Sequence, residues 1–144
     1  MTNPVLAPGD RARLISPWLQ LCPPGTIEHD LRRGPVRPGE VSADGPVVLI
    51  DQHPRSRRRL QRAARELGVV PEREFVVLPT LDRPMVVVDD VEEAVRHFWT
   101  AVATVPPGLA FAVPASAALA LARLAPWRWT GAVAPARVLV GRRR

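Results

Sequence analysis

Hydrophobic residues in this chain occur in two patterns, short continuous runs and helical stripes, and the two alternate along the sequence. The clearest run, residues 47–50, predicts a strand buried on both faces of a sheet, with Asp51 at its carboxyl end. A helix is then expected from Pro54 to Gly68, because proline suits a first helical turn and glycine suits the position after the last one. Its apolar stripe falls at helical spacing: Leu60, Ala63, Ala64 and Leu67.

Three further runs, rich in β-branched residues, predict the rest of a sheet. Residues 73–78 and 85–88 are separated by a short connection, so we expect them to pair antiparallel as a hairpin. Residues 137–141 predict a last strand, and the arginines at 142–144 are expected to be a solvated tail.

Two helices are expected between the hairpin and the last strand. The first begins at Asp90, which with Glu93 resembles a capping box. Its apolar residues recur at helical spacing up to Val105 and predict a wide buried face. Residues 115–124 are rich in Ala and Leu, follow Pro114, and predict a second, well-buried helix.

The first 46 residues have a different texture. Asp10 is a candidate cap for a short helix reaching Leu19, although Pro17 would bend or divide that helix. Proline and glycine are dense from residue 23 to residue 46, which predicts a loop or linker. The chain therefore divides into an irregular N-terminal segment, residues 1–46, and an α/β domain, residues 47–144.

The elements of the second part follow the order β-α-β-β-α-α-β. That order predicts an α/β fold with a small mixed sheet flanked by helices, like a truncated Rossmann-like sheet. Open α/β sheets bind ligands in the crevice where a strand ends and the next helix begins. Asp51 and His53 lie at this point and are the candidate cofactor-binding residues.

Composition adds a cellular context. All 20 basic residues of the 144-residue chain are Arg, which is typical of a GC-rich bacterial genome, so the net charge of +6 is weak evidence for a polyanionic partner. Cys22 is the only cysteine, and the N-terminus lacks the pattern of a signal peptide, so we expect a cytoplasmic protein. Residues 98–122 lack charge, but prolines divide them, and no membrane span is expected.

Arginines crowd the helix that follows Asp51. Several lie near its N-terminus, where the helix dipole disfavours cations, so this end of the helix invites a bound phosphate or carboxylate. Alternatively, Asp51, Glu66 or another acidic neighbour relieves the repulsion. The candidate anion-binding residues are Arg55, Arg58, Arg59 and Arg62.

Two groups of residues invite a metal-site interpretation that we do not adopt. Glu28, His29 and Asp30 are adjacent but lack a recognised ligand spacing. The acidic cluster 89–93 with His97 is explained more simply by helix capping and by an ion pair between Glu92 and Arg96.

The segment from Asp44 to Asp51, the helix after it, and the hairpin up to Val88 resemble the C-terminal portion of class I S-adenosylmethionine-dependent methyltransferases. In that family a glycine-containing turn leads into a late parallel strand, a helix follows, and antiparallel strands close the sheet. The resemblance implies a ribose-binding role for Asp51. The family's glycine-rich cofactor loop has no counterpart in this sequence.

Three classes of function follow. The first is a methyltransferase-like α/β domain that acts as an accessory subunit, or binds a nucleotide-like or anionic ligand, without independent catalysis. The second is a nucleic-acid-binding module, with Arg58, Arg62 and Arg65 on phosphates and Trp127 or Trp129 stacking on bases. The third is an enzyme, either an active small methyltransferase using S-adenosylmethionine or one with its own site at Asp51 and His53. Self-association or a protein partner is also expected.

Overall fold

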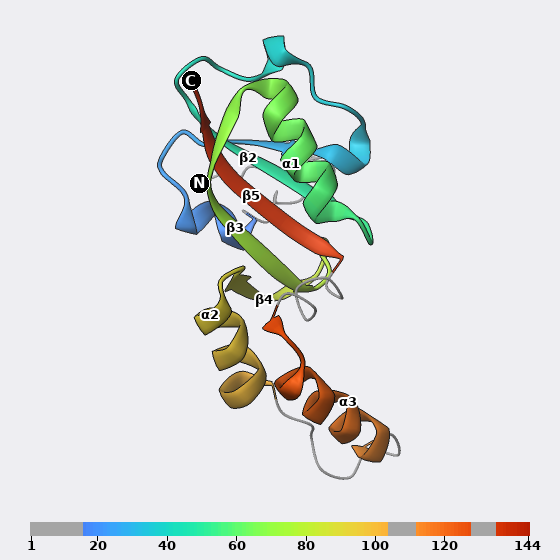
Figure 1. The fold of residues 1–144 in the computed structure, drawn as a ribbon. Coiled ribbons are helices and arrows are strands. Elements are labelled where there is room, and N and C mark those ends of the chain that lie inside the picture. The colour runs from blue at the N-terminus through green and yellow to red at the C-terminus, as the bar shows by residue number, and fades with distance from the viewer. Residues whose placement is uncertain (1–15, 104–111, 128–134) are drawn as a thin grey trace, which may run out of the picture.

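The structure is a computed structural model that describes residues 16–103, 112–127 and 135–144. Its centre is a five-stranded mixed sheet with the strand order β1-β2-β5-β3-β4 (Figure 1). The strands are β1 Ile27–Asp30, β2 Pro46–Gln52, β3 Val69–Pro79, β4 Pro84–Asp89 and β5 Ala136–Arg143. The helices are α1 Ser56–Leu67, α2 Glu92–His97 and α3 Ala112–Leu124, with short helical segments η1 Pro17–Leu21, η2 Leu31–Arg33, η3 Pro38–Glu40 and η4 Phe98–Val102.

The predicted α/β class and mixed sheet are confirmed. Strand β2 contains the predicted run 47–50, runs parallel to β1 and is buried on both faces. The hairpin of β3 and β4 is antiparallel, as expected. The last strand, β5, lies between β2 and β3 and is antiparallel to both, so the end of the chain occupies the middle of the sheet.

The prediction of a loop from residue 23 to residue 46 is wrong over β1. Residues 27–30 pair in register with β2, so this segment contributes the first strand of the sheet and precedes the predicted β-α-β-β-α-α-β order. The sequence signal was weak because the strand has four residues, three of them polar. The predicted short helix before it is described only as η1, since its earlier residues lie outside the described parts of the chain.

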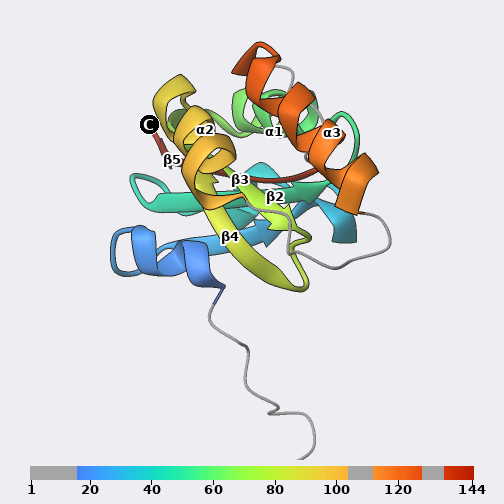
Figure 2. The same cartoon turned by 90° about the horizontal axis from the view of Figure 1, so that it is seen from below.

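The core consists of two layers, one on each face of the sheet. On one face, α1 packs its predicted stripe, of which Leu60, Ala64 and Leu67 are buried, against β2, β3 and β5. On the other face, Trp18 of η1 packs against Val48, Ile50, Phe75 and Val138. Figure 2 shows α1, α2 and α3 on one side of the sheet and η1 on the other.

Helix α1 begins two residues later than predicted, at Ser56, and ends at Gly68 as expected. Gly68 adopts the left-handed conformation, with φ of 68°, which glycine reaches without a steric penalty. Arg55 occupies the N-cap position and makes no side-chain capping hydrogen bond.

The predicted packing of the second and third helices is wrong. Asp90 does not cap α2, because Val91 is the N-cap residue and Asp90 is buried instead. Helix α2 passes into the π-helical segment η4, and along both only Val95 is fully buried. Helix α3 exists as predicted, but none of its side chains from Pro114 to Leu124 is buried.

The predicted solvated C-terminal tail is wrong in part. Residues 142 and 143 belong to β5. The Arg143 guanidinium donates to the backbone oxygens of Pro38 and Val41 at 2.7 and 2.6 Å. This contact fixes η3 against the sheet.

Candidate functional site

Strands β1, β2 and β3 run in the same direction, because β1 is parallel to β2 and both β2 and β3 are antiparallel to β5. Their carboxyl ends therefore lie at the same end of the sheet. Hydrogen bonds and ion pairs join the segments at this end of the sheet. Gln52 Oε1 accepts from the Leu81 backbone N–H at 2.9 Å, and Arg32 bridges Asp30 and Asp82 at 2.8 and 2.9 Å. The sequence predicts a ligand crevice at this position, after β2, and we refer to it below as the predicted crevice.

Asp51 lies at the end of β2 and its side chain is 0% exposed. Neither carboxylate oxygen accepts a well-formed hydrogen bond from the described residues. Burial raises the pKa of Asp51, against the opposing effect of the Arg59 charge. A buried carboxyl group that accepts no well-formed hydrogen bond is costly, and a ligand hydroxyl or amine that donates to it would relieve that cost.

Arg59 covers this carboxyl group. Its Nε lies 3.3 Å from Asp51 Oδ2, and its Nη2 is 3.5 Å from the Leu31 backbone oxygen. The Arg59 side chain is 43% exposed, so one cationic side chain lies between Asp51 and solvent on this side.

The four candidate anion-binding arginines are spread over different parts of α1. Arg59 faces the crevice, whereas Arg58 and Arg62 line a separate shallow hollow with Arg65. Arg62 pairs with Glu66 at 2.8 Å, and the backbone N–H of Arg55 donates to His53 Nδ1 at 3.0 Å. Ion pairs to Asp51 and Glu66 therefore already offset part of the arginine charge, as the alternative interpretation expected.

His53 lies next to the crevice in the turn between β2 and α1. Its backbone N–H donates to the Pro135 oxygen at 3.0 Å, which joins this turn to the start of β5. Its Nδ1 accepts from the Arg55 backbone, so the ring is held by its own turn. The turn also keeps the imidazole near the Asp51 carboxyl group.

A second buried polar pair was not predicted from the sequence. Arg137 of β5 and Asp90 contact each other through Nη1 and Oδ2, and their side chains are 4% and 1% exposed. The available signal was Arg137 itself, because an arginine inside an apolar strand needs a buried partner. The prediction that Asp90 caps a helix concealed that partner.

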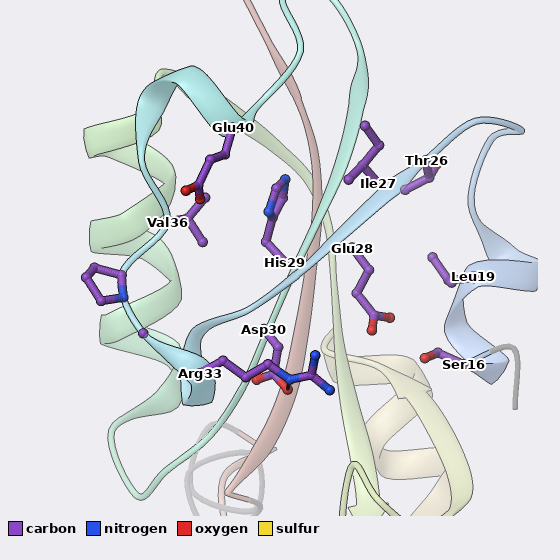
Figure 3. A pocket seen from close by; sticks show the side chains of 12 residues that line it. Ser16, Leu19, Thr26, Ile27, Glu28, His29, Asp30, Arg33, Val36 and Glu40 are labelled. Carbon is purple, nitrogen blue, oxygen red and sulfur yellow. Dashed lines mark ion pairs between the residues drawn. The ribbon is translucent and has the colours of Figure 1, made fainter. Parts of the chain in front are cut away.

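A cavity of about 860 Å³ lies along β1, the edge strand of the sheet (Figure 3). Ser16 and Leu19 of the η1 region form one wall, and residues 34–36 with Glu40 form the other. His29 points toward Val36 and Glu40 in Figure 3, and its Nε2 is enclosed without a hydrogen-bond partner among the described residues.

Two further observations concern the described residues only. No three His, Cys, Asp or Glu side chains gather there as metal ligands would. No helix in those segments combines the length and the apolar character that crossing a bilayer requires.

Comparison with known proteins identifies no relative. No family model matches the sequence, and searches of curated proteins and of solved structures find no match.

Proposed function

We propose that this chain is a methyltransferase-like α/β domain that binds a nucleotide-like ligand beside Asp51 and serves as an accessory subunit without independent catalysis. The observation that carries the proposal is the Asp51 carboxyl group, fully buried at the end of β2 and without a well-formed hydrogen bond. Ligand hydroxyls would donate to Asp51, and an anionic group of the ligand would pair with Arg59.

The arrangement of the elements supports the methyltransferase-like part. Gly45 precedes β2, β2 is parallel to β1, α1 follows, and antiparallel strands complete the sheet. In this proposal the sheet is a truncated Rossmann-like sheet. The accessory role is inferred from the sequence, which lacks the glycine-rich loop that lets a backbone approach such a cofactor.

Calorimetric titration with S-adenosylmethionine, S-adenosylhomocysteine and adenosine monophosphate tests the proposal. We expect at least one of the three to bind. Asp51→Asn keeps the shape of the side chain and should weaken binding about tenfold or more, since a hydrogen bond to a charged group contributes ~1.5–3 kcal/mol. Glu72→Gln, a matched change on the exposed side of β3, should leave the affinity unchanged. No binding of any of the three would reject the proposal.

Arg59→Ala tests how much the anionic group of the ligand contributes to binding, separately from the hydroxyls. It should weaken the binding of adenosine monophosphate more than the binding of adenosine. Arg58→Ala removes an exposed arginine one residue earlier on α1 and is the matched control. Methyl transfer by the isolated chain would instead make it an active small methyltransferase.

One observation favours nucleic acid as the second candidate. Arg58, Arg62 and Arg65 lie together on an exposed face of α1. Trp127 lies elsewhere, in a cavity with Trp99 between α2, η4 and α3, so it does not extend this face, and Trp129 is outside the described residues. Affinity for a single-stranded oligonucleotide that falls steeply with salt, and falls further in Arg58→Ala with Arg62→Ala, would support this alternative.

A further inference from the structure

We propose that the outer edge of β1 binds an extended segment of a partner protein that alternates basic and apolar side chains, and adds it to the sheet as a further strand. The inference rests on the accessory role proposed above, and it names the surface that would bind the partner protein. The ligand crevice and this edge are tested by different residues.

The backbone of β1 has a side that faces away from the rest of the described sheet. Among the described strands β1 is the first in the sheet order and pairs only with β2. In a parallel pair, alternate residues direct their N–H and C=O groups toward the neighbouring strand, and the others direct theirs outward. The described backbone hydrogen bonds include none to that outer side, so an added strand would find donors and acceptors there.

The surface along β1 is hollowed and walled. The cavity of about 860 Å³ follows β1 and has a wall on each side, η1 on one and residues 34–40 on the other (Figure 3). A peptide strand laid between these walls would contact both faces of the sheet at once. The enclosed Nε2 of His29 supplies a further unsatisfied polar atom on this surface.

Charge differs between the two faces of β1. Glu28 points toward η1, where its carboxylate accepts from Trp18 Nε1 at 2.7 Å and has no cationic partner among the described residues. Asp30 is on the same face but is already paired with Arg32 at 2.8 Å and with Arg33, which also lines the cavity, at 3.7 Å. A basic side chain of the added strand would therefore be placed opposite Glu28.

The other face of β1 is more apolar. Ile27 is 44% exposed there, and Val36 lines the cavity beside His29. Because side chains of a strand alternate between faces, a partner with basic residues at every second position would place apolar residues against Ile27 and Val36.

The same charges argue against a second copy of this chain as the occupant. Antiparallel pairing of two β1 strands about a two-fold axis sets residues from the same face opposite each other. Glu28 would then face Glu28 or Asp30 of the second copy. Like charges directly opposite each other are destabilising, so the edge selects a basic partner.

Peptide binding to variants in which the charge of Glu28 is removed or reversed tests the inference. The probe is a short synthetic peptide alternating arginine and valine, and the binding of the whole chain is followed by fluorescence anisotropy. Glu28→Gln should weaken binding roughly two- to fivefold. Glu28→Arg should abolish preference for the arginine peptide and confer preference for one alternating glutamate and valine. Glu66→Gln on α1 removes the same charge far from β1 and should change nothing.

Two controls separate strand pairing from simple charge attraction. A peptide whose valine nitrogens are methylated keeps its charge but loses donors, and it should bind much more weakly. Hydrogen exchange should slow at the outward amides of β1 when the unmodified peptide binds.

Equal binding of both peptides, or unchanged exchange in β1, would overturn the inference. Dimerisation of the chain that strengthens in Glu28→Gln would overturn it in favour of self-pairing. Glu28→Gln leaves Asp51 intact. Retained nucleotide binding in this variant would show that loss of peptide binding at β1 does not depend on the ligand site at Asp51.

Discussion

Helices α1 and α3 are nearly equal in length, 12 and 13 residues, but the more polar helix, α1, is the one that is buried against the sheet. Helix α1 carries five arginines and still buries Leu60, Ala64 and Leu67 against the sheet. Helix α3 is mostly Ala, Leu and Val, yet Leu121 and Leu124 are 70% and 85% exposed. The comparison teaches that a helix is buried by a one-sided stripe and not by total hydrophobicity.

The difference extends to the regions around the two helices. Around α1, residues from β2, β3 and β5 form a continuous buried layer. The segments α2, η4 and α3, which we call the helical arm, extend beyond β4 in Figure 1 and bury only Val95 fully among their described side chains. Stability should therefore reside in the sheet and α1, and six substitutions, controls included, test this division.

The largest effect is expected where the arm joins the sheet, at the buried pair of Asp90 and Arg137. Asp90→Ala leaves the Arg137 charge without this carboxylate and should lower the free energy of unfolding by ~3–5 kcal/mol. Glu92→Ala breaks the exposed pair with Arg96 and should cost only about 0.3–0.5 kcal/mol. Urea denaturation measures both, and equal small losses would show that the buried pair does not anchor the arm.

The second effect concerns the stripe of α1. Leu60 is 2% exposed, and Leu60→Ala leaves a cavity between α1 and the sheet. The expected loss is ~2–5 kcal/mol, measured as a shift in the denaturation midpoint. A loss below about 1 kcal/mol would mean that α1 is held by its ion pairs and not by its apolar stripe.

A smaller, pH-dependent effect is expected at Asp51. Its pKa is raised by burial, so the stability it contributes is fully present below its unfolded-state pKa and is lost as pH rises through the folded-state value. Asp51→Asn should therefore raise the free energy of unfolding at neutral pH and change it little in acid.

Asp30 is the matched control for this pH dependence. Burial acts to raise the pKa of Asp30, but its hydrogen bonds and charge pairing with Arg32 outweigh burial and lower that pKa. Its contribution is present above the unfolded-state pKa and is lost as pH falls. Asp30→Asn should lower stability at neutral pH, the opposite sign to Asp51→Asn, and the same sign for both would refute the assignment.

The smallest effect is expected in α3. Leu124→Ala shortens a side chain that is 85% exposed, and it should change the free energy of unfolding by no more than about 0.5 kcal/mol. Denaturation of this variant beside Leu60→Ala compares the two helices directly. A loss as large as that of Leu60→Ala would show that α3 is covered in solution.

The elements with a strong local pattern were predictable. Residues 47–50 formed a strand because a continuous apolar run has to be covered on both faces, and Gly68 ended α1 because the αL position favours glycine. Asp51 was found as a candidate for the same reason, since its position follows from the strand end. The short, polar strand β1 was missed because its pairing with β2, and not its own composition, makes it a strand.

The sequence by itself determined which segments become strands and helices over most of the described α/β part, and that a carboxylate stands at the end of β2. Only the tertiary structure decided that β5 lies between β2 and β3, that Asp90 pairs with Arg137, and that α3 remains exposed. The physical reason is the sequence separation over which each kind of interaction acts. Hydrophobic periodicity and caps act between neighbours in the chain, whereas strand order and buried ion pairs join residues far apart, whose meeting depends on the whole fold.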